Sequence, residues 1–487
     1  MDGQVETERK YELAPGQQLP SLAALATEGP VTSFDLVATY YDSPDCRLAR
    51  ARRVLRRREG GHDEGWHLKL PGERADERLE LQAPLAHRRP PAELRELVED
   101  LLAGAALVPL ATLRTHRSEL QLLGVDGALL AVTTTDDVVA TAGPDRQEWR
   151  EAEVELAAGD PALLDQVEAV LAAAGIPRSG SASKGGQALR GRIAAAEAAD
   201  PAAAGTVLLD YAGRQLGTLQ ANEAATRADG PDAVHKSRVA TRRLRSTLKT
   251  YAGVLGPGVD RLRAELRWHA ELLGAARDAE VLTERLAAAL AELPQPVDDA
   301  VTRLVSDSLA RTHGAAHTRL VESMDTERYE ALHAGLEGFL TDPGLPAVAD
   351  EPAKVVLTPM LGQAVRRVRR LARRAAAQPG DLGLWHEVRK AAKAARYGAE
   401  VLVPVLGDRA EDWRARWEAV TEALGAVQDC VVAQAVIGDL AASAAAQQVP
   451  VRPLAELARG QQQALAEALL VSRKALRKAL AERPRDT

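Results

Sequence analysis

Three charged residues near the start of the chain have a spacing that suits a metal ion and a polyanion. Glu6, Glu8 and Lys10 occupy alternate positions in the segment 5–11. Because successive side chains of a strand point to opposite faces, the two carboxylates and the ammonium would share one face. Carboxylate oxygens suit Mg²⁺ or Mn²⁺, and a lysine acts as a point charge toward phosphate. So short a motif also fits an exposed edge strand, so the rest of the chain must distinguish a metal and polyanion site from an edge strand.

Charged side chains share a face on most of the strands that the sequence predicts after this one. Breaks at Gly, Pro and Asp predict strands over 35–41, 53–58, 65–70, 78–82, 114–123, 129–136 and 149–156. Helices are expected over 21–28 and 161–174. The sets that share a face are Arg56 and Arg58, His67 and Lys69, Arg78 and Glu80, and Glu151, Glu153 and Glu155. Repeated charge alternation indicates a closed sheet with a charged lumen.

Composition sets the class of protein. A chain of 487 residues has room for roughly two to four domains. Its formal charge of −7 argues against nonspecific coating of nucleic acid. Cys46 and Cys430 lie far apart in the sequence and indicate neither a disulfide framework nor a thiolate metal site. No signal-peptide pattern and no uninterrupted apolar run of about 18 residues is present, so we expect a cytoplasmic protein with no membrane partner.

Motifs across residues 1–195 resemble the CYTH family, also called triphosphate tunnel metalloenzymes. In the family's order they are 6–10, 40–45, 54–58, 66–69, 78–80, 114–117, 136–137, 151–156 and 183–184. In that family eight antiparallel strands form a tunnel in which basic side chains hold a triphosphate and acidic ones hold a divalent metal. The resemblance therefore predicts an α+β domain over residues 1–200, with an eight-stranded antiparallel β tunnel and flanking helices.

The resemblance also implies roles for individual residues of the tunnel. Phosphate contacts are implied for Lys10, Arg56, Arg58, Lys69, Arg117 and Lys184. Ligands of Mg²⁺ or Mn²⁺, or groups that orient water, are implied at Glu6, Glu8, Asp136, Glu151 and Glu153. The catalytic set would be Glu6, Glu8, Lys10, Glu151 and Glu153. The sequence does not decide whether three further side chains, Arg57, His67 and Arg78, face the lumen, because a slip of one residue in register would move each to the other face.

From residue 206 onward the hydrophobic period becomes that of amphipathic helices. Gly and Pro breaks predict nine or ten helices over 206–485, and an alanine-rich linker places the domain boundary near residue 202. One pattern occurs twice: basic residues follow His235 and His386 at +3, +7 and +10, and an Asp follows each His by 43 residues. The repeated spacing predicts an all-α bundle with an internal twofold repeat, its halves at about 206–340 and 355–485.

The basic residues of each copy would form a stripe along one helix, within an arc of roughly 80°. The two stripes comprise His235, Arg238, Arg242, Arg243 and Arg245, and His386, Arg389, Lys393 and Arg396. With predicted turns at 274–278 and 425–429, they resemble a CHAD domain, a helical module that often follows CYTH. The resemblance implies binding of inorganic polyphosphate. The scarcity of aromatic residues in the stripes agrees, because single-stranded nucleic acid sites interleave aromatic and basic side chains.

The leading hypothesis is a two-domain protein that hydrolyses triphosphate, or the ends of short polyphosphate, in a metal-dependent tunnel and binds polyphosphate with its helical domain. One alternative is a polyphosphate-binding or targeting protein whose tunnel turns over little. Another is a nucleotide-acting enzyme of the same fold, such as an adenylate cyclase or a thiamine triphosphatase. Sparse aromatic residues near the tunnel motifs favour a linear inorganic phosphate, and no specific nucleic acid partner is expected.

Overall fold

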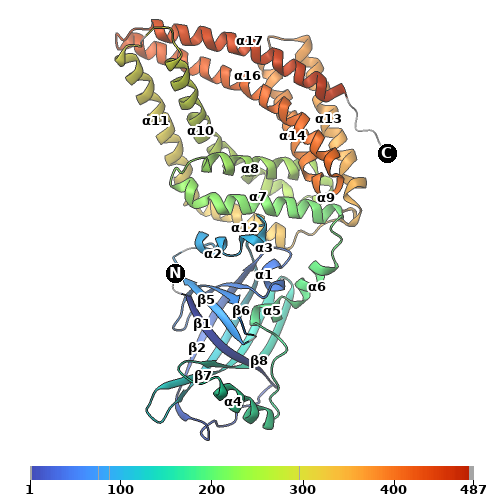
Figure 1. The fold of residues 1–487 in the computed structure, drawn as a ribbon. Helices are drawn as coiled ribbons and strands as arrows, with labels where there is room; N and C mark the ends of the chain where they lie inside the picture. The colour runs from blue at the N-terminus through green and yellow to red at the C-terminus, as the bar shows by residue number, and fades with distance from the viewer. Residues whose placement is uncertain (1–2, 75, 87, 296, 482–487) are drawn as a thin grey trace. The chain divides into compact units, whose positions relative to one another are not determined.

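The computed structural model describes residues 3–74, 76–86, 88–295 and 297–481. The chain divides into two compact units, one formed mainly by residues up to 199 and the other mainly by residues from 200 onward. Strands build the first unit and helices build the second (Figure 1). Each unit has hydrophobic clusters of its own.

The first unit is a closed antiparallel barrel of eight strands in the order β1-β5-β4-β3-β2-β6-β7-β8. The strands are β1 (Gly3–Leu13), β2 (Thr27–Asp42), β3 (Val54–Glu59), β4 (Gly65–Pro71), β5 (Glu77–Ala83), β6 (Val108–Leu123), β7 (Leu129–Ala142) and β8 (Asp145–Leu156). The predicted tunnel of eight antiparallel strands is thus confirmed.

Every predicted strand is present, but several are longer than their sequence pattern. β2 begins at Thr27, because its first half pairs with β6 as far as Leu123. The predicted helix over 21–28 is therefore wrong: its last residues belong to β2 and the preceding ones form a turn. The Glu28 carboxylate fixes that turn by accepting hydrogen bonds from the Leu22 N–H at 2.6 Å and the Ser21 hydroxyl at 3.0 Å.

Apolar side chains of the strands face outward, where short helices cover them. These helices are α1 (Arg47–Arg50), α2 (Ala92–Glu96), α3 (Glu99–Leu102) and α4 (Ala162–Ala173). The unit also contains α5 (Lys184–Ala188) and α6 (Arg190–Ala198). Tyr11 and Leu13 of β1 pack against Leu164 and Val167 of α4. Because Lys10 alternates with Tyr11, burying the apolar face outside the barrel turns the charged face into the lumen.

The second unit is helical. Its described helices are α7 (Ala204–Arg227), α8 (Ala233–Thr250), α9 (Ala252–Leu255), α10 (Val259–Ala291), α11 (Asp299–Met324), α12 (Glu327–Thr341), α13 (Ala353–Ala377), α14 (Leu382–Val401), α15 (Val403–Leu406), α16 (Asp408–Ala446) and α17 (Arg452–Ala481), with a 3₁₀ turn at Ala347–Asp350. The predicted breaks at Gly and Pro occur. The sequence pattern missed the breaks at Tyr251 and at 325–326, which contain neither residue.

Helix packing follows the same order in both halves of this unit. α7, α8, α10 and α11 pack successively in the first half, and α13, α14, α16 and α17 do so in the second. The two halves meet where α8 packs against α14, the helices that carry the two basic stripes. Residues 199–203 between α6 and α7 are not helical, and this is the region where we expected the domain boundary.

One described helix, α16, is long and apolar enough to cross a membrane by length and composition alone. A helix packed inside a helical bundle passes the same test, and α16 packs against α14 and α17. The expected cytoplasmic location stays a prediction.

Candidate functional site

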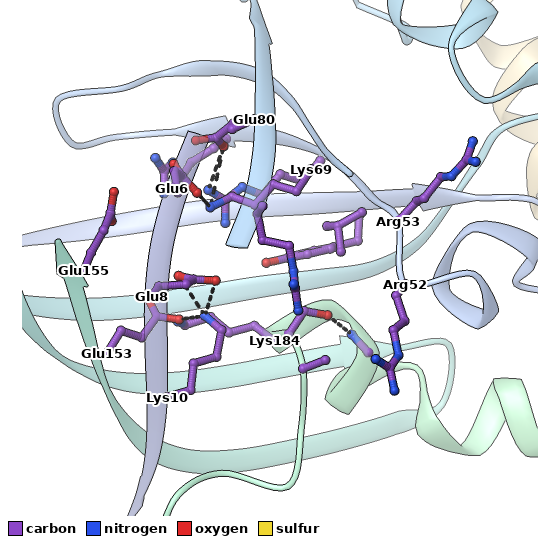
Figure 2. A pocket seen from close by; sticks show the side chains of 18 of the residues that line it. Glu6, Glu8, Lys10, Arg52, Arg53, Lys69, Glu80, Glu153, Glu155 and Lys184 are labelled. Carbon is purple, nitrogen blue, oxygen red and sulfur yellow. Dashed lines mark hydrogen bonds and ion pairs between the residues drawn. The ribbon is translucent and has the colours of Figure 1, made fainter. Parts of the chain in front are cut away.

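The barrel encloses a cavity of about 140 Å³ whose walls carry charged side chains (Figure 2). Most of the residues predicted for the tunnel line it. They are Glu6, Glu8, Lys10, Arg56, Arg58, Lys69, Arg117, Glu153 and Lys184. Five strands and α5 contribute these side chains, so only the closed barrel brings them together.

The strand register shows which face of the barrel is occupied by the three side chains that the sequence left undecided. Arg78 lies opposite Glu6 in the pairing of β5 with β1, and it lines the cavity. His67 points inward as well, since its Nδ1 lies 2.8 Å from the Glu80 carboxylate. Arg57 alternates with the lumenal Arg56 and Arg58, so it lies on the outer face, where it pairs with Glu59.

Three buried carboxylates form the only group of acidic, His or Cys ligands within metal-binding reach in the part of the chain that the structure describes. One oxygen from each of Asp136, Glu151 and Glu153 lies within 4.8 Å of the other two. Lys184 is ion-paired with all three, with its Nζ 2.7 to 2.8 Å from each. An all-oxygen donor set suits a hard divalent cation, so these residues fit a metal without fixing its identity.

Glu153 is the member of this group that reaches the cavity. Arg117 donates to it at 2.9 Å, and both Lys10 and Lys184 contact it. Burial disfavours its charged form, but these three cations outweigh burial and hold the pKa of Glu153 well below its usual value. Asp136 and Glu151 lie behind the cavity wall, so of the three only Glu153 is placed to face a substrate.

A second pair of carboxylates, Glu6 and Glu80, lies on neighbouring strands beside Lys69 (Figure 2). Burial, reinforced by a hydrogen bond between the two side chains, raises the pKa of Glu6 to about 8. Glu6 therefore carries the proton that this pair shares near neutral pH. Sequence reasoning noticed Glu80 but gave it no role. The signal that would have identified it is its register opposite Lys69.

The cavity also has lining residues that the sequence analysis did not assign. They are Tyr40, Arg52, Arg53, Asp63, Arg78, Glu80 and Glu155, together with the small or apolar residues Ala49, Val54, Ala182, Ser183 and Gly186. Asp63 pairs with Arg58 from the loop between β3 and β4. Arg52, Arg53 and Asp63 lie outside the strands, where the alternation of side chains along a strand gives no information about direction.

The helical unit contains a larger cavity, about 720 Å³, between α8, α10, α14 and α16. Basic residues predicted from the stripes line it: His235, Arg238, Arg242, His386, Arg389, Lys393 and Arg396. Arg277 and Arg285 add to them from α10. The carboxylates on its walls are Asp278, Glu418, Glu422 and Asp429. Two long basic helices thus face one shared, mainly cationic space.

The repeated glycines lie inside long helices, so the turns predicted at 274–278 and 425–429 are wrong. A Cβ at Gly274 would lie 3.9 Å from Arg238 Nη2, and one at Gly425 would lie 3.3 Å from Arg389 Nη2. At Gly425 the missing side chain leaves room for Arg389, whereas at Gly274 a Cβ would make only ordinary contact with Arg238. Arg238 reaches Asp278, 43 residues after His235, at 3.0 Å.

Two residues of the first stripe lie outside this cavity. Arg243 projects from a different side of α8 and pairs with Glu400 at 2.7 Å. Arg245 is exposed, although its counterpart Arg396 lines the cavity and pairs with Glu418.

The charge of the facing residue explains the difference between Arg245 and Arg396. Position 267 corresponds to 418 by the same offset of 151 residues, and there the first half has an arginine. Besides burial, Arg267 lowers the pKa of Arg245, as expected for two cations that repel. Binding of polyphosphate by Arg243 and Arg245 stays a prediction.

Comparison with known proteins agrees with the two-unit organisation. Models of the CYTH domain and the CHAD domain match residues 4–185 and 210–438, respectively. The uncharacterized protein Rv2226 of Mycobacterium tuberculosis is 31% identical over 465 residues, 87% of this chain and 89% of that protein. Thiamine-triphosphatase of Homo sapiens is 44% identical over 72 residues, 14% of this chain and 28% of that protein.

A solved structure of the CHAD domain from Ricinus communis covers 58% of this chain and 93% of that chain, with 25% identity and a TM-score of 0.45. The CYTH family includes triphosphatases and adenylate cyclases and depends on metal ions, and CHAD domains are associated with polyphosphate binding. With both domain models matched in order and a relative aligned over most of its length, this chain belongs to the family of proteins in which a CYTH domain is followed by a CHAD domain.

Proposed function

We propose that the barrel hydrolyses inorganic triphosphate, or the end of a short polyphosphate, with Mg²⁺ or Mn²⁺, and that the helical unit binds polyphosphate. The interleaving of cations and carboxylates around the barrel cavity supports the first part. Without substrate these groups pair with one another, as Lys184 does with Asp136, Glu151 and Glu153. A metal–triphosphate complex carries both signs of charge, so it would give the cations phosphate oxygens and the carboxylates a metal.

The side chains divide the work by their chemistry. Arg56, Arg58 and Arg117 would clamp phosphate oxygens, and the three lumenal lysines would add point charges. Asp136, Glu151 and Glu153 would hold the divalent metal, which supplies charge stabilisation at the leaving phosphate when it is bound. A water molecule held by a lumenal carboxylate would attack the terminal phosphorus in line. As the water oxygen forms a bond to the terminal phosphorus, the bridging P–O bond to that phosphorus breaks. One proton of the water passes to the carboxylate, and the products are orthophosphate and diphosphate.

The cavity wall favours an inorganic substrate. Tyr40 is the single aromatic residue among the described residues that line it, and its side chain is buried. Tyr40 lies opposite Arg56 in the pairing of β2 with β3. A nucleobase or a thiazolium ring bound there would find no exposed aromatic face on which to stack. Competition by ATP tests this: we expect ATP to inhibit tripolyphosphate turnover weakly.

Phosphate release from tripolyphosphate, with Mg²⁺ and then Mn²⁺, tests the proposed hydrolysis. We expect the intact protein to turn over and the Glu6→Gln/Glu8→Gln variant to be inactive, because Glu8 is a charged lumenal carboxylate beside Lys10 and Glu6 shares its proton with Glu80. Glu12→Gln is the matched control, since Glu12 has the same alternation on β1 but is exposed and does not line the cavity. If the intact protein releases no phosphate while it still binds polyphosphate, the hydrolase proposal fails and the chain is a polyphosphate-binding protein.

Polyphosphate binding by the helical unit is supported by the size and charge of its cavity. A space of about 720 Å³ lined by two basic helices can take a flexible polyanion, which offers only repeated phosphate charge. Its carboxylates are dispersed over the wall, and Asp278 is paired with Arg238. This arrangement supports holding a polymer rather than cleaving it.

A further inference from the structure

Three consecutive residues form a rim at one side of the barrel cavity. Arg52 and Arg53 precede β3 and Val54 is its first residue, and all three line the cavity. Figure 2 shows Arg52 and Arg53 on the opposite side of the cavity from Glu153 and Glu155. The rim is therefore remote from the carboxylates to which the proposed function assigns the chemistry.

Arg52 has a backbone conformation that an arginine rarely adopts. Its φ of 57° lies in the left-handed region, directly after the C-cap of α1. The N–H of Arg52 bonds to the Ala49 carbonyl at 3.0 Å and that of Arg53 to the Leu48 carbonyl at 2.8 Å. Glycine usually occupies this position after a helix because it has no Cβ to clash. A strained residue whose side chain lines a cavity points to a role for that side chain.

The rim extends the cationic path of the lumen outward. Arg56 is the first lumenal arginine of β3, and it lies two positions after Val54, a distance of roughly 7 Å. Asp100 holds Arg53 with an ion pair of 3.0 Å, whereas Arg52 is more exposed. Because the rim offers a guanidinium and an aliphatic side chain but no aromatic ring, it suits another phosphate better than an organic group.

We infer that Arg52 is a specificity-determining residue that binds the phosphate beyond the three held in the cavity. The barrel would then take a polyphosphate by its end, with the terminal phosphate toward Glu153 and the rest of the chain leaving past the rim. This inference rests on the proposed function and adds to it a preference for chains longer than three phosphates.

The test is Arg52→Gly in the full-length protein, with steady-state kinetics on tripolyphosphate and tetrapolyphosphate. We expect the KM for tetrapolyphosphate to rise about threefold to tenfold, because a charge-assisted contact at a partly exposed rim is lost. The KM for tripolyphosphate and both kcat values should stay unchanged, and the melting temperature should rise because glycine relieves the strain. An equal change in both KM values, or a change in neither, would overturn the inference.

Ala103→Gly is the matched control. Ala103 also has a left-handed φ, 48°, after a short helix of the same unit, and it is exposed and outside the cavity. It should raise the melting temperature without changing either KM.

If the intact protein hydrolyses neither substrate, the proposed function fails while the rim can still be tested. Binding of tripolyphosphate and tetrapolyphosphate is then measured by calorimetry without metal. The protein carries Arg242→Ala and Lys393→Ala, which weaken binding in the helical cavity. Adding Arg52→Gly should selectively weaken the binding of tetrapolyphosphate. Equal affinities before and after that substitution would refute the role of Arg52.

Discussion

The barrel cavity and the helical cavity are lined by the same kinds of side chain, but they arrange the carboxylates differently. In the barrel, the oxygens of Asp136, Glu151 and Glu153 gather within 4.8 Å of one another. No second group of this kind exists among the described residues, and in the helical cavity Asp278 faces its own arginine at 3.0 Å. Gathered carboxylates require a cation and can hold a metal, whereas dispersed ones only orient arginines. Under the proposed function, this difference separates a site for chemistry from a site for binding.

The two cavities also differ in size and in the pairing of their cations. The barrel cavity is about 140 Å³ and its lysines are ion-paired with buried carboxylates. The helical cavity is about 720 Å³, and Lys393 lies there among other cations, Arg238, Arg242 and Arg389. Fixed pairs suit a substrate with one geometry. A large cavity with an excess of positive charge suits a flexible polyanion.

The largest effect is expected from Glu153→Gln in the barrel. This carboxylate faces Lys10, Arg117 and Lys184 at once, so its neutral isostere removes a metal ligand and unbalances the cations. Tripolyphosphate turnover should fall on the order of 10²-fold or more, while polyphosphate binding by the helical unit stays the same. Phosphate release and a thermal melt of the same preparation check this. A folded variant that keeps wild-type turnover would show that the gathered carboxylates are not the centre of the chemistry.

The next effect concerns the salt dependence of polyphosphate binding. Replacing Arg238 and Arg389 by alanine should reduce the slope of log affinity against log salt by about two, one for each lost phosphate contact. Titrations with long-chain polyphosphate at several salt concentrations measure the slope. Arg245→Ala is the control on the same basic stripe, because Arg245 lies outside the cavity. If Arg245→Ala weakens binding as much as either cavity substitution, the polymer follows the outer surface instead.

Lys393 should make binding depend on pH. Burial, followed by Arg242, Arg389 and Arg238, lowers its pKa to about 6, and only Asp278 opposes them. Lys393 is therefore mostly neutral in the empty cavity above pH 6, and a bound polyanion, which favours the ammonium, makes it take up a proton. Affinity should rise as pH falls from 8 toward 6, by up to about tenfold per pH unit for this one proton.

Lys393→Arg is the control for that pH dependence, since arginine occupies the corresponding position 242 in the first half. Calorimetry in buffers of different ionisation enthalpy should detect less proton uptake in the variant. Identical proton uptake by the two proteins would exclude Lys393 as the group that titrates.

The smallest effect compares the two glycines of the repeat. Alanine at Gly274 or Gly425 should stabilise the helix by about 1 kcal/mol. At Gly274 the new Cβ stays 3.9 Å from Arg238, but at Gly425 it comes within 3.3 Å of Arg389, which must shift. Only Gly425→Ala should weaken polyphosphate binding, by roughly twofold. Thermal melts and titrations of both variants check this, and equal binding by both would show that the position of Arg389 is not critical.

Patterns within one strand or one helix could be predicted from the sequence, because their period is fixed by the backbone. The alternation of Glu6, Glu8 and Lys10 placed all three side chains in the lumen. Contacts between side chains of different strands or helices depend on the register between those segments and could not be predicted in this way. Glu80 gains a role because it lies opposite Lys69, and Arg245 has Arg267 as a neighbour where Arg396 has Glu418. The rim at Arg52 follows from a backbone conformation that no periodicity reveals.

The most direct test of the division between the two cavities is phosphate release by the full-length protein from tripolyphosphate and from long-chain polyphosphate. Wild type, Glu153→Gln and the Arg238→Ala/Arg389→Ala variant should be compared with Mg²⁺ or Mn²⁺. The account predicts that Glu153→Gln loses activity on both substrates, while the double variant keeps wild-type kcat and KM on tripolyphosphate and loses efficiency only on the long chain. Turnover that survives in Glu153→Gln, or tripolyphosphate hydrolysis that falls in the double variant, would contradict it.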